Sequence, residues 1–184
     1  MGSQLDSRTQ LTKITVSLHW VIAIAVLGSL FFGMYLEDLP RSQEKGALIG
    51  IHKSVGMLVL FVALYRIYWR LKNSFPERLT PVSSWQEKVT SIVHTLLLAT
   101  TVLMPVSGVI MSVGGGYPVG IFGVELIAAG TENELLGRIG HILHGVGGKV
   151  MLFAVAIHVL ASIKHAVVTR DGTLQRILGK RIAG

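Results

Sequence analysis

The stretch GHILHGVGGKVMLFAVAIH, residues 140–158, places two histidines, His144 and His158, in a segment that is otherwise almost wholly apolar. They are fourteen positions apart, just under four turns of an α-helix, so both imidazoles leave the same helix face. Their levels differ by about 21 Å along the axis, which is most of the hydrocarbon thickness of a bilayer. The segment therefore predicts a membrane-spanning helix with one histidine toward each end.

The composition also favours a membrane protein. Of the 184 residues, 51% are hydrophobic and 15% are charged, whereas soluble domains contain about a quarter charged residues. The net charge of +7 does not indicate a nucleic-acid partner, because Lys and Arg stand at the ends of apolar stretches rather than among stacking aromatics. Cysteine is absent, which excludes disulfides, iron–sulfur clusters and covalently attached haem.

Four apolar stretches are long enough to cross a lipid membrane, at about 14–36, 47–71, 86–113 and 138–168. The first contains no charged residue and is too long for the core of a signal peptide, so we expect it to be retained. Pro105 predicts a kink in the third. Short connections favour an all-α, up-down-up-down bundle of four helices, in one transmembrane domain covering 1–184.

Basic residues predict the orientation of this bundle. Twelve of the seventeen Lys and Arg lie in the N-terminal tail, in the stretch from Arg66 to Lys88, and in the C-terminal segment from Lys164. Because Lys and Arg near span ends favour the cytoplasm, both termini are expected on the cytoplasmic side.

Counting from the span ends groups four histidines into two pairs. His19 and His158 share a level near the cytoplasmic surface, whereas His52 and His144 share a level near the outer surface. Two imidazole pairs stacked across a membrane are the arrangement of a di-haem electron carrier, in which axial histidines leave no open coordination position. Arg66 lies on the helix face of His52 but at the inner level, where a haem propionate requires a cation.

Each of these signals has a simpler interpretation when taken alone. A single transmembrane histidine is more often a hydrogen-bonding or proton-handling group than a metal ligand. Gly56 and Gly148 each follow an outer-level histidine by four residues and would leave room for a porphyrin, but such glycines more often serve helix packing. His94 is interpreted mainly as a hydrogen-bonding group. His141 is rotated off the shared face and is expected at most to contact the edge of an outer haem.

His165 and Lys164 lie at the cytoplasmic boundary of the fourth span. His165 follows His158 by seven residues and therefore lies on the same helix face. This position suits a quinone headgroup or a haem propionate, although a solvated boundary residue is the default interpretation.

Five motifs resemble those of the bacterial cytochrome b561 family, and the resemblance covers nearly the whole chain. They are SLHW (17–20), IHKSVG (51–56), YRIYWR (65–70), LHGVGGKVMLFAVAIH (143–158) and IKHAVVTRDGTLQRILG (163–179). The resemblance implies a multi-pass cytochrome of the bacterial inner membrane with two haems b. It implies that His19 and His158 bind the cytoplasmic-side haem, and that His52 and His144 bind the periplasmic one.

The resemblance also implies electron transfer to ubiquinone, with a residue at the position of His165 near the quinone. Some members of the family oxidise superoxide on the periplasmic side. We therefore expect an oxidoreductase of the superoxide:ubiquinone type that moves electrons from a periplasmic donor to ubiquinone near His165 and Lys164. No catalytic side chain is expected, because the redox chemistry belongs to the haems and the quinone. Lys53 and Lys149, on the outer side, are candidates for steering an anionic donor.

Two other functions remain open at this stage. The chain could be a haem-carrying membrane anchor for a hydrogenase or dehydrogenase, although its short acidic outer loops argue against a large docking platform. It could also be a histidine-lined transporter of metal ions or protons, although it lacks the intramembrane carboxylates that proton relays commonly use. The glycine-rich stretch 114–123 matches no motif, and its role is left open.

Overall fold

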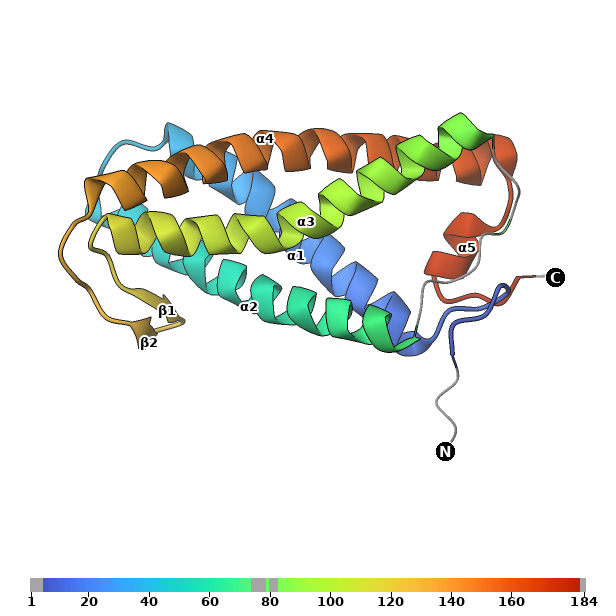
Figure 1. Ribbon diagram of the computed structural model, residues 1–184, viewed down its shortest axis with the longest axis horizontal. Coiled ribbons are helices and arrows are strands. Elements are labelled where there is room, and N and C mark those ends of the chain that lie inside the picture. Colours follow the sequence, from blue (N-terminus) through green and yellow to red (C-terminus); the bar gives the residue numbers. More distant parts are fainter. Residues whose placement is uncertain (1–4, 74–78, 80–82, 183–184) are drawn as a thin grey trace.

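The computed structural model describes residues 5–73, 79 and 83–182. Four long helices run in alternating directions (Figure 1): α1 (Lys13–Asp38), α2 (Gln43–Asn73), α3 (Ser84–Gly114) and α4 (Glu134–Lys164). A π-helical turn, η1 (His165–Thr169), and a short helix, α5 (Thr173–Ile177), follow α4. The predicted four-helix bundle is confirmed. We call the end of the bundle that holds both chain termini the terminal end, and the opposite end the hairpin end.

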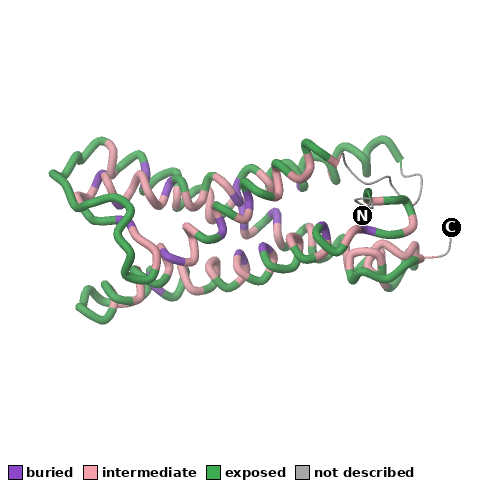
Figure 2. Tube along the Cα trace, turned by 90° about the horizontal axis from the view of Figure 1, so that it is seen from below, coloured by how far each residue is buried: buried purple, intermediate pink, exposed green. Residues whose placement is uncertain are grey.

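The outside of the bundle is apolar. All four long helices are long and apolar enough to cross a membrane, and only 11–22% of the most apolar stretch of each is buried. Figure 2 shows exposed and half-buried residues along most of the chain, with few and scattered buried residues. Among the exposed side chains are Phe31, Phe61 and Phe153. An apolar surface this extensive requires lipid around it.

A small apolar core occupies the middle of the bundle. It is formed by Ile22, Val26, Val59 and Met151, with Met104 among the side chains packed around it. Met151 lies seven residues from both His144 and His158, so the core separates the two histidine levels.

Helix α3 bends near its middle, as Figure 1 shows. Pro105 lies within this helix. A proline inside a helix has no N–H to donate and its ring crowds the preceding turn, which bends the helix axis. The kink predicted from the sequence is therefore explained by this residue.

The hairpin-end halves of α3 and α4 come very close together. A Cβ atom on Gly140 would overlap the backbone of Met111, and one on Gly114 would overlap the backbone of Gly137. Only glycine permits such an approach, which brings the two backbones into van der Waals contact. Three glycines thus set how α4 is placed against α3.

The glycine-rich stretch beyond α3 forms a β-hairpin, an element that the sequence did not predict. Strand β1 (Val119–Ile121) pairs antiparallel with β2 (Val124–Ile127), and a two-residue turn at Phe122 and Gly123 joins them. Both turn residues have positive φ, 45° and 90°. Figure 1 shows the hairpin beside the first turns of α2.

Three contacts attach the hairpin to α2. Val119 is only 1% exposed, and β1 packs against α2. The Phe122 backbone N–H donates to Ser54 Oγ at 2.9 Å, and Lys53 Nζ donates to the Pro118 carbonyl at 3.0 Å. The hairpin is therefore held in a fixed place beside the helix that carries His52.

The close approach of α3 and α4 predicts a strong effect of Gly140→Ala. The added methyl group must push the helices apart, which we expect to lower the free energy of unfolding by about 3 kcal/mol. Thermal unfolding of the detergent-solubilised protein, followed by circular dichroism, measures this loss. Gly145→Ala is the matched control, since a Cβ there meets nothing within 4 Å. Equal stability of the two variants would show that the close approach is not required.

Candidate functional site

Two pairs of imidazole rings lie inside the bundle. At the terminal end, the rings of His19 on α1 and His158 on α4 have centroids 6.3 Å apart and planes inclined at 52°. At the hairpin end, the rings of His52 on α2 and His144 on α4 have centroids 6.2 Å apart and planes inclined at 81°. All four residues are half-buried. The structure thus brings together the same partners that the sequence predicts.

The spacing of the rings fits one metal ion between each pair. An imidazole nitrogen binds a metal ion at about 2 Å, and its ring centre lies about 1 Å behind it, so opposed ligands have centroids about 6 Å apart. Across the described residues, no group of three or more His, Asp or Glu is placed to hold a metal ion. Each pair offers two protein ligands, which suits an iron whose four other positions are filled by a porphyrin.

Helix α3 fixes the ring orientation of His144. Its Nδ1 lies 3.1 Å from the Met104 carbonyl oxygen and 3.0 Å from Ser107 Oγ. A carbonyl oxygen only accepts hydrogen bonds, so the proton belongs on Nδ1 and the lone pair on Nε2. An imidazole held in this way is oriented for ligation through Nε2, and the hydrogen bond raises its basicity.

His52 carries an unsatisfied polar atom. Its Nδ1 is buried and has no hydrogen-bond partner among the described residues. The Phe32 ring lies 6.0 Å away on one side of the imidazole, centroid to centroid. A buried polar atom without a partner is costly, and a missing ligand is one of the few ordinary explanations for it. The residues at this level therefore fit a bound group.

The glycines next to the hairpin-end imidazoles are not Gly56 and Gly148, which the sequence suggested because each follows a histidine by four residues. Gly56 faces Pro105 and Gly148 faces Met104, so both serve contacts with α3. The packing interpretation is therefore the better one for these two residues. A Cβ on Gly33 would lie 3.3 Å from His52 Cε1, and one on Gly108 would lie 3.5 Å from His144 Cε1.

The terminal-end pair has a third imidazole and an arginine beside it. The ring of His94 lies 5.4 Å from that of His158, centroid to centroid. Arg66 is half-buried and interacts electrostatically with both His19 and His158. The sequence placed Arg66 at this level correctly. It did not reveal the contact of His94, because only the packing of α3 against α4 brings His94 next to His158.

His165 lies two turns beyond His158, where α4 gives way to η1. Its Nδ1 is 2.6 Å from Asp171 Oδ2, and the side chain of Asp171 is only 2% exposed. Burial alone raises the pKa of Asp171, but hydrogen bonds from Thr173 and His165 outweigh this and bring the pKa below its usual value. Lys164, the last residue of α4, is exposed. Asp171 is a partner of His165 that the sequence analysis missed.

The N-terminal segment is tied to the terminal end by a second buried carboxylate. Asp6, with a side chain 1% exposed, accepts hydrogen bonds from Arg70 at 2.6 Å, Thr15 Oγ1 at 2.8 Å and the Thr12 N–H at 2.7 Å. Burial alone raises the pKa of Asp6, but these hydrogen bonds hold it below its usual value of 3.8. The Asp6 carboxylate thus attaches the N-terminal segment before α1 to the last turn of α2.

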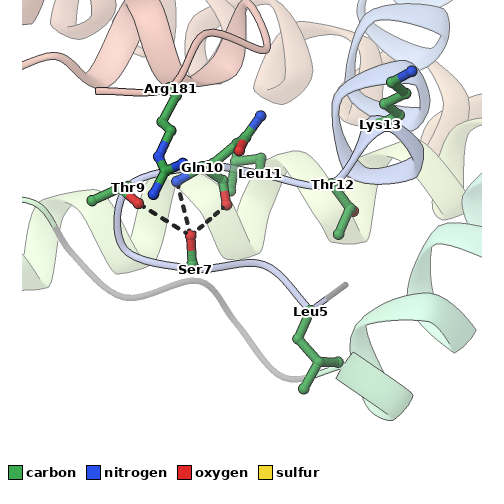
Figure 3. A pocket seen from close by; sticks show the side chains of 8 residues that line it. All are labelled: Leu5, Ser7, Thr9, Gln10, Leu11, Thr12, Lys13 and Arg181. Carbon is green, nitrogen blue, oxygen red and sulfur yellow. Dashed lines mark hydrogen bonds between the residues drawn. The ribbon is translucent and has the colours of Figure 1, made fainter. Parts of the chain in front are cut away.

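A surface pocket at the same end lies along this N-terminal segment (Figure 3). It is lined by residues 5, 7 and 9–13 and by Arg181. Ser7 Oγ closes a local turn by hydrogen bonds to the N–H and carbonyl groups of Gln10. No histidine lines the pocket, so it is separate from both imidazole pairs.

Three further residues singled out from the sequence lie outside the pairs. His141 is exposed on α4 and interacts electrostatically with His144. Lys149 is exposed at the midpoint of the same helix, at the level of the apolar core and not at the outer surface. Lys53 is bonded to the Pro118 carbonyl, as described above, so it serves the attachment of the hairpin.

Four helices of membrane-spanning length, with two pairs of imidazole rings between them, define a helical membrane protein. The sequence profile of the prokaryotic cytochrome b561 family matches residues 10–180. The chain belongs to this family. It is therefore a multi-pass membrane protein that uses b-type haem for electron transfer across a membrane.

Curated relatives match along their whole length at modest identity. Cytochrome b561 homolog 2 of Escherichia coli K12 is 27% identical over 179 residues, covering 91% of this chain and 90% of that protein. Cytochrome b562 of Cereibacter sphaeroides is 29% identical over 175 residues, covering 92% and 96%. A probable superoxide oxidase of Yersinia pestis is 22% identical over 168 residues, covering 91% and 95%.

The buried carboxylate of Asp6 predicts a pH-dependent effect of Asp6→Asn. The change removes the negative charge that Asp6 places beside Arg70, and we expect a loss of about 2–3 kcal/mol in unfolding free energy at pH 7. Because the folded pKa is lowered, this stability is present above pH 3.8 and is lost as pH falls through the folded value. Thermal unfolding at a series of pH values should show the two proteins converging in acid. Glu134→Gln, at an exposed ion pair, is the control and should cost no more than about 0.5 kcal/mol.

Proposed function

We propose that the chain carries electrons across the bacterial inner membrane through two b-type haems, from a periplasmic donor to ubiquinone. The observation that carries this proposal is the presence of two imidazole pairs, spaced at 6.3 and 6.2 Å, at opposite ends of one bundle. About 21 Å along α4 separates the two levels, and the apolar core lies between them. The arrangement suits two electron stations stacked across a bilayer.

In this proposal His19 and His158 hold one haem, and His52 and His144 hold the other. Bound haem supplies reversible one-electron chemistry, and the protein sets its position and potential. Ser107 and the Met104 carbonyl orient His144 and raise its basicity. Arg66, beside the terminal-end pair, provides the cation that a buried propionate needs.

The terminal end is assigned to the cytoplasm. Lys and Arg are enriched there, and the positive-inside rule places such segments on the cytoplasmic side. Ubiquinone would then accept electrons near His165 and Lys164. Reduction of a quinone takes up protons as well as electrons, and the Asp171 carboxylate can hold His165 in the orientation needed to deliver one.

Superoxide is the proposed donor at the hairpin end. This proposal rests on the name of the Yersinia pestis relative, a probable superoxide oxidase, and on the small size of the elements at this end, which suits a small donor.

The haem ligands are tested by His144→Ala and His158→Ala. Each change removes one axial ligand, so each variant should bind one haem per chain where the parent binds two. A pyridine haemochrome assay on the purified protein gives this number directly. His141→Ala, which removes an exposed histidine from the same helix, should leave both haems in place. Two haems in either test variant would overturn the assignment, and a chain that purifies without haem would point to a histidine-lined transporter.

The quinone site is tested by His165→Ala. With both haems retained, oxidation of the reduced protein by ubiquinone should slow by about 100-fold, because a positioned proton donor is lost. Stopped-flow absorbance at the haem α-band measures this rate in proteoliposomes. The haem spectrum and count should not change, which separates this result from a failure of haem binding. An unaltered rate would place the quinone elsewhere.

A further inference from the structure

We propose that the β1–β2 hairpin is an interfacial membrane element. It inserts Phe122, Val124 and Leu126 into the headgroup boundary of the leaflet at the hairpin end. This inference concerns a surface away from the imidazole pairs and does not depend on the proposed function.

The first argument is the depth of the hairpin tip. The Phe122 N–H is bonded to Ser54 Oγ, and Ser54 lies seven residues beyond Ala47, where the apolar part of α2 begins. Seven residues of helix correspond to about 10 Å. The hairpin therefore folds back along α2 instead of projecting beyond the helix ends, as Figure 1 shows, and its tip is level with the apolar part of the helix.

The second argument is the exposure of the hairpin side chains. Val119 faces α2 and is buried, whereas Phe122 is 63%, Val124 65% and Leu126 49% exposed. Large apolar side chains gathered on one small element mark a surface that meets another apolar phase. At this depth the neighbouring phase is lipid.

The third argument is the residue at the turn. Phe122 has a φ of 45°, in the left-handed region that bulky side chains rarely adopt. A two-residue turn of this kind usually carries Asn, Asp or Gly at this place. Phe122 therefore holds its ring at an exposed tip at a conformational cost. In the proposed location, contacts of this ring with lipid offset that cost.

The polar groups of the hairpin limit how deep it can lie. A two-stranded ribbon has two open edges, and unpaired backbone groups are not tolerated in the hydrocarbon core. Glu125 on β2 is exposed, and Tyr117, before β1, is 66% exposed. Tyrosine is enriched at membrane–water interfaces, where headgroups and water satisfy the polar groups while acyl chains cover the apolar ones.

Exposed apolar side chains of α2 flank the point where the hairpin is attached. Ile51 and Leu58, three residues before and four residues after Ser54, are 47% and 44% exposed. This spacing places both on the same helix face as Ser54. Because that face belongs to a helix long and apolar enough to cross a membrane, lipid is favoured over a second protein chain as the occupant.

The absence of cysteine from the chain permits a direct measurement of depth. Val124→Cys, labelled with a nitroxide and reconstituted into phosphatidylcholine–phosphatidylglycerol vesicles, reports accessibility to oxygen and to a water-soluble nickel chelate. Phe153→Cys, 70% exposed on α4, is the lipid reference, and Glu132→Cys, exposed before α4, is the water reference. We expect the oxygen-to-nickel ratio at Val124 to be several-fold above that at Glu132 and to remain below that at Phe153, as an interfacial depth requires.

Two results would overturn the proposal. A ratio equal to that at Glu132 would place the hairpin in water, and protection from both reagents would show that a protein surface covers it.

A second variant, Phe122→Asn, tests the tip itself, because asparagine suits the turn but removes the ring. In the Val124→Cys background it should lower the ratio several-fold while circular dichroism stays unchanged. An unaltered ratio would contradict the insertion of Phe122.

Discussion

The close contact between α3 and α4 at Gly114, Gly137 and Gly140 is the constraint on which the remaining structure depends. Because the backbones touch there, the rotation of α4 about its axis is fixed, and both of its inward histidines face the bundle interior. The same contact brings the Met104 carbonyl and Ser107 to the Nδ1 of His144. Gly114 also ends α3, so the loop that forms the hairpin starts from this contact.

The two ends of the bundle are stabilised by different means. At the terminal end, Asp6 and Asp171 are buried carboxylates that bind Arg70 and His165 and thereby tie the N-terminal segment and the C-terminal turn to the helices. At the hairpin end, backbone contacts and the attachment of the hairpin to Ser54 serve the same purpose. A bundle that faces lipid cannot rely on the hydrophobic effect between its helices, so close packing and specific polar contacts replace it.

The sequence predicts the features that depend on spacing along one helix. The four spans agree with the helices to within a few residues, and the fourteen-residue interval in α4 correctly places one histidine at each level. The features it misses depend on contacts between distant segments. Gly33 and Gly108 lie beside imidazoles of other helices, and Asp171 meets His165 only because η1 turns the chain back. The hairpin was also missed, because three consecutive glycines followed by very short strands have the sequence pattern of an unstructured loop.

The apolar core around Met151 has an electrical consequence. The side chains of Ile22, Val26, Val59 and Met151 form an apolar layer, so much of a transmembrane voltage falls across the distance between the two imidazole levels. Moving one elementary charge through the full voltage requires about 2.3 kcal/mol per 100 mV. In the proposed direction of transfer, from the hairpin end to the terminal end, an electron moves toward the negative side of the membrane and its energy rises. A donor that acts in this way must therefore supply enough driving force to exceed the work done against the cell's own polarisation.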